Sequence, residues 1–203
     1  AWLRLSRAAE IQAEERRKGW VPVAAERKLK EELNGLLVRG RIDRIDRNER
    51  DGSHRVLDYK TSDNLPAEQH WTSAGPDPGE FPDYVLFTML AANGRELLKR
   101  WTGLQLPLYR WWAEQQSEFA GKAISVGYFN LPAEQDKVGV ELWPELNEDI
   151  MEKAMACAAG VVADLQAGWS GEPRAKVKYE DFEEIFFHDP REAAVPLTAK
   201  EDA

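Results

Sequence analysis

The chain has a single cysteine, Cys157, among its 203 residues. One thiol cannot form an internal disulfide or build a cysteine-only metal cluster, so folds that depend on either are excluded. We expect a reducing, cytoplasmic environment for such a chain. No apolar run approaches the roughly 20 residues that a membrane-spanning helix needs, and no secretory signal core stands at the N-terminus. We therefore expect no membrane partner.

Excess positive charge is also missing. The chain has 27 Lys and Arg residues but 36 Asp and Glu residues, which gives a net charge of −9. Nucleic-acid-binding domains usually carry a basic balance, so this composition weighs against nucleic-acid binding in general but does not decide the matter. A nuclease is still compatible with it, because a metal site gathers acids and a local basic strip can lie on an acidic whole.

The apolar pattern predicts alternating helices and strands, with no internal repeat and no low-complexity tract. A mixed central β-sheet flanked by helices is the α/β fold class that accommodates this order. The chain starts at Ala1, without Met and inside helix-like sequence, so we expect a piece of a longer protein. The expected helices are 2–18, 85–98, 104–120 and 147–167 (with Asn147 as N-cap), and the expected strands are 21–29, 36–47, 54–61, 123–131 and 138–143.

The remaining segments lack a clear period. Residues 62–84 are rich in proline and glycine, and we interpret them as a loop inserted over the site. Residues 1–170 are expected to form one domain, and 171–203 to form an extension that packs on it. His54, His70 and His188 have no metal-ligand spacing, and we expect all three to face solvent.

Two acids and a lysine are placed so that their side chains can meet. The strands before and after Asp51-Gly52 are expected to form a hairpin, which puts Asp43 and Asp58 on paired strands. Because side chains alternate along a strand, Asp58 and Lys60 share one face. Two carboxylates beside an ammonium can hold a divalent metal and orient a phosphate against water.

These residues belong to a pattern that resembles the PD-(D/E)XK nuclease superfamily, most closely its RecB-like and AddB-like exonuclease domains. Glu26 also falls where that group commonly carries a glutamate. Three successive motifs carry the resemblance: Gly40-Arg41-Ile42-Asp43-Arg44-Ile45-Asp46, Val56-Leu57-Asp58-Tyr59-Lys60-Thr61 and Gln105-Leu106-Pro107-Leu108-Tyr109.

The resemblance implies a restriction-endonuclease-like fold and a nuclease, with exonuclease action, that uses Mg²⁺ or Mn²⁺ to hydrolyse DNA. Asp43 and Asp58 would bind the metal with the carbonyl of Tyr59, and hard cations do prefer such oxygen ligands. Lys60 would orient the attacking water or offset negative charge. The implied context is the nuclease domain of a helicase–nuclease in DNA repair and recombination, with a helicase domain or partner subunit.

Several supporting assignments stay open. Gln105 and Tyr109 lie four residues apart, on one helical face, and either shape the site or cap the core with polar tips. Glu26 supports the site or forms a structural salt bridge. The candidates for DNA contacts are Arg41, Arg44 and Thr61, although salt bridges within the sheet would explain both arginines equally well.

Neighbouring residues have simpler interpretations. Asp46 is an odd number of positions from Asp43, so we expect it to face the other way and to pair with Arg44 or Arg47. Cys157 is expected to be a small packing residue on an alanine-rich helix. Trp101, Trp111 and Trp112 are expected in the core rather than as base-stacking platforms.

The chain also departs from those relatives. Many AddB-like proteins hold an iron–sulfur cluster with cysteines beyond the last helix, and the equivalent residues 172–189 contain none, so no such cluster is expected. The first-helix metal ligand is not identifiable, with Glu10, Glu14 and Glu15 as candidates. These departures leave room for a nuclease-fold domain that binds DNA ends, or docks on a subunit, without cutting.

Overall fold

A computed structural model describes residues 2–62, 70–75, 79, 81–91 and 93–168. By its internal contacts the chain divides into two units, residues 1–163 and 164–203. The expected extension, 171–203, lies outside the described residues, as do residues 63–69, 76–78 and 80 of the expected inserted loop. Within the described part, no helix is long and apolar enough to cross a membrane.

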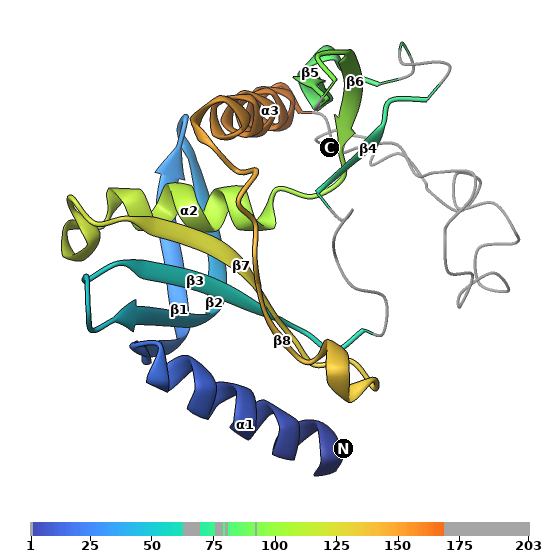
Figure 1. Ribbon diagram of the computed structural model, residues 1–203. Helices are drawn as coiled ribbons and strands as arrows, with labels where there is room; N and C mark the ends of the chain where they lie inside the picture. The colour runs from blue at the N-terminus through green and yellow to red at the C-terminus, as the bar shows by residue number, and fades with distance from the viewer. Residues whose placement is uncertain (1, 63–69, 76–78, 80, 92, 169–203) are drawn as a thin grey trace, which may run out of the picture. The chain divides into compact units, whose positions relative to one another are not determined.

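The first unit is built on a five-stranded sheet in the order β1-β2-β3-β7-β8 (Figure 1). All neighbouring strands are antiparallel except β3 and β7, which are parallel. A parallel pair needs a crossover connection, and here the crossover contains a second, three-stranded sheet and a helix. The strands are β1 Trp20–Leu33, β2 Leu36–Asn48, β3 His54–Lys60, β7 Ile124–Asn130 and β8 Gly139–Leu142.

Helices lie on both faces of this sheet (Figure 1). Val56 of β3 packs in one apolar cluster with α2, whereas its neighbour Leu57 packs in another with Ile11 of α1. Adjacent strand residues point to opposite faces, so α1 and α2 cover opposite sides of β3. The helices are α1 Trp2–Arg17, α2 Gln105–Gln115 and α3 Glu148–Gln166, and short 3₁₀ turns occur at Asp83–Val85, Ser117–Phe119 and Gln135–Lys137. The expected α/β class, a mixed sheet flanked by helices, is confirmed.

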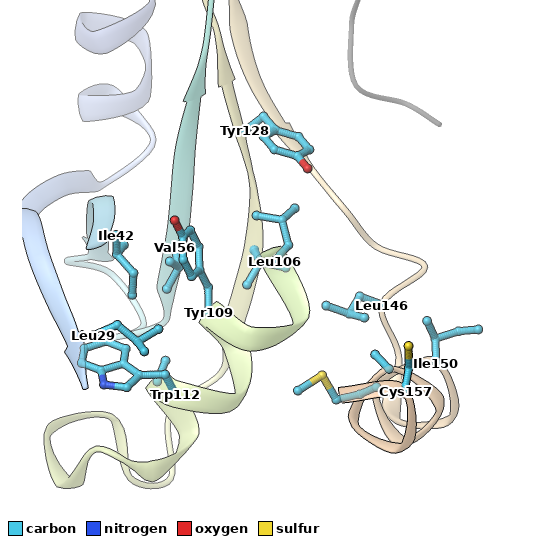
Figure 2. Close-up of a cluster of buried hydrophobic side chains, with 14 of the residues drawn as sticks. Leu29, Ile42, Val56, Leu106, Tyr109, Trp112, Tyr128, Leu146, Ile150 and Cys157 are labelled. Atoms are coloured by element: carbon cyan, nitrogen blue, oxygen red, sulfur yellow. The ribbon is translucent and has the colours of Figure 1, made fainter. Parts of the chain in front are cut away.

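The main core lies on the α2 side of the sheet. Figure 2 shows side chains from the strands, from α2 and from α3 meeting there. Cys157 of α3 is part of this core, and burial raises the pKa of its thiol to about 11, which confirms its role as a packing residue. Trp101 and Trp112 are also buried there, as expected.

The expected helix over residues 85–98 is wrong. Residues Leu86–Leu90 form β5 and Glu96–Trp101 form β6, and the two pair antiparallel. β6 also pairs with β4, Trp71–Ser73, inside the segment that we interpreted as a loop. The signal for a hairpin was Asn93-Gly94, where Gly94 has a φ of 77° and turns the chain.

The ends of two elements and the exposure of two histidines also differ from expectation. The expected helix 104–120 ends at Gln115, and β1 runs on to Leu33. Asn147 caps α3, since its Oδ1 accepts the backbone N–H of Ile150 at 3.0 Å, as expected. His54 and His70 do not face solvent, because each packs against aromatic rings and is more than 90% buried.

Candidate active site

Asp58 and Lys60 lie at the C-terminal end of β3, on the face that α2 covers. The Asp58 side chain is almost completely buried, and Lys60 Nζ stands 2.7 Å from its Oδ2 atom. Leu57 points to the opposite face, as the alternation of a strand requires. The expected pairing of this carboxylate with this ammonium on one face is therefore present.

Asp43 lies in β2 at the point where the pairing of β2 with β3 ends. The pairing of β2 with β3 ends at Arg44 opposite Leu57, so Asp43 is the first residue beyond the ladder. Its Oδ2 atom accepts the backbone N–H of Tyr59 at 2.9 Å. Ile42 and Ile45 pack in the same cluster, which strict alternation would forbid, so the alternation breaks around Asp43. Ile45 accordingly lies in the core.

Glu26 lies opposite this break, in the neighbouring strand. The β1–β2 ladder runs on both sides of it, from Ala25 opposite Arg44 to Arg27 opposite Ile42. Glu26 has a φ of 53°, which is uncommon for a residue other than glycine and marks local strain. Its carboxylate binds Arg41 Nη1 at 2.8 Å, with both side chains about 60% exposed. The salt-bridge alternative for Glu26 is therefore the one that the structure shows.

Gln105 ties the two strand residues to α2. Its Nε2 atom donates to Asp58 Oδ1 at 2.6 Å, and its Oε1 atom accepts from Lys60 Nζ at 3.2 Å. Tyr109, one helical turn later, accepts from Gln105 Nε2 at 3.0 Å and donates to the backbone carbonyl of Arg41 at 2.8 Å. Both side chains thus belong to the hydrogen-bond network around Asp58 rather than capping the core alone.

The electrostatics of this cluster favour an added cation. Burial raises the pKa of the Asp58 carboxyl, and the nearby charge of Asp43 raises it further, although Lys60 and Gln105 oppose the shift. Two neighbouring carboxylates with one ammonium leave net negative charge in a half-buried place. A divalent cation between them would neutralise this charge, and carboxylate oxygens suit Mg²⁺.

The protein ligands for such a cation are few. Among the described residues, no three or more histidine, cysteine or acidic side chains converge to hold a metal ion. Mg²⁺ commonly takes only one or two carboxylates and completes its shell with water and phosphate oxygens, so Asp43 and Asp58 are chemically adequate. A role for the Tyr59 carbonyl stays a prediction.

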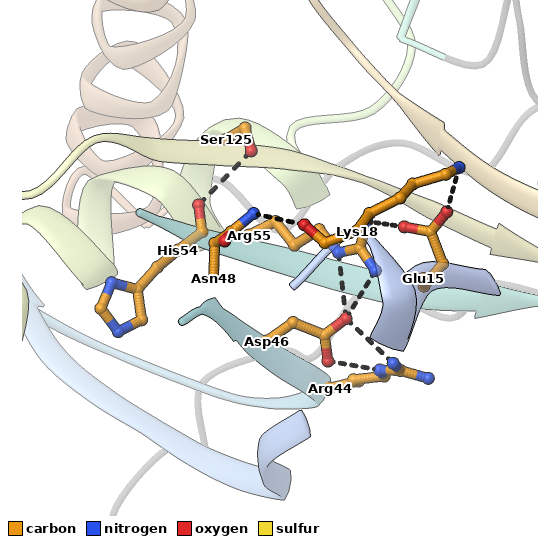
Figure 3. A network of polar contacts seen from close by, with 8 residues as sticks. All are labelled: Glu15, Lys18, Arg44, Asp46, Asn48, His54, Arg55 and Ser125. Atoms are coloured by element: carbon orange, nitrogen blue, oxygen red, sulfur yellow. Dashed lines mark hydrogen bonds and ion pairs between the residues drawn. The ribbon is translucent and has the colours of Figure 1, made fainter. Parts of the chain in front are cut away.

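Behind the site, a buried ion network joins β2, β3 and α1 (Figure 3). Asp46 lies between Arg44, at 2.6 Å, and Arg55, at 2.9 Å, and Arg55 also binds Glu15 at 2.5 Å. Arg44 is only 5% exposed, so we correct our candidate DNA contact: its guanidinium serves a salt bridge with Asp46, the alternative that we had left open. Asp46 faces away from the site, as expected.

The same network decides the role of Glu15. Because Leu57 shares a face with Arg55, and α1 packs on that face, Glu15 lies on the side of β3 opposite Asp58. It is therefore a structural partner of Arg55 and not a first-helix metal ligand. Glu10 and Glu14 both bind Arg7 on the same helix.

Two further residues, Tyr128 and His70, lie beside the cluster and were not among the predicted site residues. Lys60 Nζ lies 5.3 Å from the centre of the Tyr128 ring, and the Tyr128 hydroxyl lies 3.5 Å from His70 Nε2. No local pattern points to either residue, because parallel pairing of β3 with β7 brings Tyr128 opposite Asp58. Of the remaining candidate DNA contacts, Arg41 and Thr61 are exposed.

Comparison with known proteins gives one family. The profile of the PD-(D/E)XK nuclease superfamily matches residues 1–186, which includes every residue of the cluster. No curated protein matches the chain. Proteins of this superfamily are typically metal-dependent nucleases. With its mixed sheet, its paired strand acids and a profile match over most of its length, the chain belongs to the PD-(D/E)XK nuclease superfamily.

Proposed function

We propose that this protein is a deoxyribonuclease that hydrolyses DNA phosphodiester bonds with Mg²⁺ or Mn²⁺. The observation that carries the proposal is the convergence of Asp43, Asp58 and Lys60 beside Gln105. Asp43 and Asp58 hold the metal, with the carbonyl of Tyr59 as a further ligand. The metal supplies charge stabilisation on the phosphoryl oxygens and a nucleophilic water near neutral pH.

Lys60 and Gln105 have different roles: Lys60 stabilises charge, and Gln105 positions its neighbours. In the metal-free protein Lys60 lies 2.7 Å from Asp58. Once released from Asp58, its ammonium would offset the negative charge that develops on the reacting phosphate. Gln105 contacts both Asp58 and Lys60, and it fixes the direction of each. Tyr109 anchors Gln105 to the backbone of Arg41. Gln105 and Tyr109 are thus positioning residues.

A strip of exposed cations supports DNA as the substrate. In the β1–β2 hairpin, Lys28 lies opposite Arg41 and Lys30 lies opposite Arg39, and all four residues are exposed. Leu29 is buried against α2, so alternation puts the four cations on the other face. Like charges directly across a ladder destabilise it, and a polyanion would remove that cost. We call these four residues the cation ladder.

The cation ladder starts next to the candidate site. Arg41 is two residues before Asp43, and its carbonyl binds Tyr109. Only Arg41 of the four has a carboxylate partner among the described residues, namely Glu26. A phosphate backbone that leaves the site and passes the β1–β2 hairpin to the other face of the sheet would meet this positive charge, in spite of the net charge of −9. Thr61, exposed directly after Lys60, is a further candidate contact.

The finer assignment is an exonuclease of the RecB-like or AddB-like kind, acting with a helicase domain or partner subunit in repair and recombination. Its support is the order and spacing of the motifs around Asp43, Asp58 and Gln105. A helicase that feeds a strand would also relieve this chain of making most phosphate contacts.

A second candidate is a nuclease-fold domain that binds DNA without cutting it. One observation favours it: both Asp58 oxygens are already engaged, one by Lys60 and one by Gln105. Metal binding then requires Lys60 to release Asp58. The intact acids argue for the nuclease, because a buried carboxylate without a function is costly to keep.

The experiment that separates the two is incubation of labelled single- and double-stranded DNA with Mg²⁺ or Mn²⁺. We expect cleavage by the wild type, loss of cleavage in Asp58→Ala and unchanged cleavage in the control Asp136→Ala, an exposed acid outside the cluster. Intact DNA with the wild type, together with retained DNA binding, would instead establish the non-cleaving domain.

A further inference from the structure

An open pocket of about 500 Å³ lies beside the candidate site, and no step proposed so far uses it. Its volume is within the range of small-molecule sites. Four of its lining side chains are aromatic: His70 and Trp71 at β4, Tyr128 of β7, and Trp143 just after β8. All of these residues belong to the first unit.

Tyr128 is the wall that the pocket shares with the candidate site. Asp58 is paired with Tyr128 in the β3–β7 ladder, and the Lys60 ammonium lies 5.3 Å from the Tyr128 ring centre. On its other flank, the Tyr128 hydroxyl lies 3.5 Å from His70 Nε2. A group bound in the pocket is therefore a close neighbour of any phosphate held at Lys60.

The rings in the pocket wall are nearly parallel. His70 stacks on Trp143 with ring centres 3.6 Å apart and planes 8° apart, and its plane lies 11° from that of Tyr128. Flat rings with a common orientation form a platform that another flat ring can extend. Trp143 is only half-buried, so it is the member of this stack that a ligand can reach.

The charges in the pocket select against a phosphate. Burial, followed by the charge of Lys60, lowers the pKa of His70 to about 4, so the imidazole is neutral at pH 7. The other ionisable groups in the wall are Glu141 and Glu145, both exposed. Carboxylates repel phosphate oxygens but accept hydrogen bonds from the amino groups of bases.

We propose that this pocket receives an unpaired nucleobase of the strand that is cut at Asp58 and Lys60. The inference rests on the proposed nuclease function and adds the class of substrate. A base inside a duplex is paired and stacked, and it reaches a side pocket only by leaving the helix. The pocket therefore selects single-stranded DNA or an unpaired end, with Trp143 as the stacking residue.

The test is a binding measurement in EDTA, where no cleavage occurs. Fluorescence anisotropy of a labelled single-stranded oligonucleotide is compared for wild type, Trp143→Ala and Trp143→Phe. If a base stacks on Trp143, Trp143→Ala should lower the affinity for the oligonucleotide by about tenfold or more. Trp143→Phe keeps an aromatic ring, so its affinity should stay near that of the wild type. Trp111→Ala, a half-buried tryptophan of α2 outside the pocket, is the matched control.

A second measurement needs no variant that could fail to fold. Oligonucleotides with one abasic nucleotide, moved along the strand, are titrated into the wild type. We expect a loss of affinity at one position of the strand, where the missing base would otherwise enter the pocket. The pocket assignment would be overturned if the wild type had the same affinity whatever the position of the abasic nucleotide. Equal affinity for duplex and single-stranded DNA would also overturn it.

The two proposals fail in different ways. If the wild type cleaves DNA but neither Trp143→Ala nor the abasic scan changes affinity, the pocket assignment is wrong and the nuclease stands. If base-dependent binding is found without any cleavage in Mg²⁺ or Mn²⁺, the nuclease is wrong and the pocket stands.

Discussion

Asp58 is a carboxylate with both oxygens occupied, in a cluster short of positive charge. Lys60 holds one oxygen and Gln105 the other, and Asp43 adds a second negative charge nearby. Lys60 in this arrangement stands in for part of the charge that a divalent metal would supply. A metal bound at Asp58 would supply that charge, and the Lys60 ammonium would then be available to the phosphate.

Replacing Lys60 with alanine should therefore separate catalysis from metal binding. We expect Lys60→Ala to lower the cleavage rate by about 10²–10³-fold or more, because the charge opposite the developing phosphoryl negative charge is removed. Mn²⁺ affinity, measured by calorimetric titration, should stay the same or increase, since Lys60 no longer competes for Asp58. A large loss of Mn²⁺ affinity would mean that Lys60 shapes the metal site instead.

The raised pKa of Asp58 predicts a pH dependence. Only the ionised carboxylate binds a metal, so Mn²⁺ affinity should fall with decreasing pH through the raised pKa, at a higher pH than for an ordinary aspartate. In Asp43→Asn one like charge is gone, and the Asp58 pKa should decrease. Carboxyl chemical shifts followed by NMR in the metal-free protein give both values. An Asp58 pKa at or below the ordinary value in the wild type would be inconsistent with this electrostatic account.

At the scale of elements, the β1–β2 hairpin is where the charge pattern departs from ordinary sheet chemistry. The cation ladder puts like charges opposite each other on an acidic protein, and we assign it to the phosphate backbone. Each phosphate that a lysine or arginine neutralises releases counterions, so the logarithm of affinity falls linearly with the logarithm of salt concentration.

The double variant Lys28→Gln and Lys30→Gln should reduce the steepness of that salt dependence. We expect the slope for single-stranded DNA to decrease by about 1.4, which is roughly 0.7 for each phosphate that is no longer neutralised. Filter binding at several salt concentrations measures it. Lys153→Gln on α3, which is paired with Asp149, is the matched control and should leave the slope unchanged. Equal slopes for the double variant and the control would show that Lys28 and Lys30 do not contact DNA phosphates.

How much the sequence predicts depends on the range of the interaction. Asp58 with Lys60, and Gln105 with Tyr109, were predictable because two-residue and four-residue spacings set shared faces locally. The pairing of Asp46 with Arg44 was predictable for the same reason. The break of alternation at Asp43 was not predictable, because it depends on where the pairing of β2 with β3 ends.

The incorrect and missing predictions also concern features that contacts between distant residues decide. The apolar residues from Val85 to Leu98 suit a helix or a strand, and the pairing of β6 with both β4 and β5 decides between them. Tyr128 and His70 gain their place beside Lys60 only through the parallel β3–β7 pair and the second sheet. Arg55 donates a hydrogen bond to Glu15, which lies 40 residues earlier in the chain. No local spacing indicates this ion pair.

For the whole molecule, the buried ion network is the structural counterpart of the candidate site. It fixes β2, β3 and α1 on the face opposite Asp58, so the strands that carry Asp43 and Asp58 keep their register. Burial alone would raise the pKa of Glu15, but hydrogen bonds from Lys18 and Arg55 outweigh it, and the pKa is lowered. A lowered carboxyl pKa stabilises the fold above the unfolded-state value, and this stability is lost as pH falls through the folded-state value.

Glu15→Gln should thus destabilise the protein in a pH-dependent way. At pH 7 we expect a loss of about 1.5–3 kcal/mol in the free energy of unfolding, because a charged hydrogen bond to Arg55 is removed. The difference from wild type should shrink as the pH falls below the ordinary glutamate range, since Glu15 is then protonated as well. Urea unfolding at several pH values measures this. The half-buried neighbour Glu14 makes only a long contact with Arg7, so Glu14→Gln should change stability by less than about 1 kcal/mol at each pH. A Glu15→Gln effect of the same size at all pH values would contradict the linkage.

The measurement that tests the central claim most directly is a crystal structure of the full chain soaked in Mn²⁺. We predict anomalous density between Asp43 and Asp58, about 2 Å from an oxygen of each, with Lys60 Nζ displaced from Asp58 Oδ2. Density bound elsewhere, or an Asp58–Lys60 pair that persists at saturating Mn²⁺ with nothing between the two aspartates, would contradict the account.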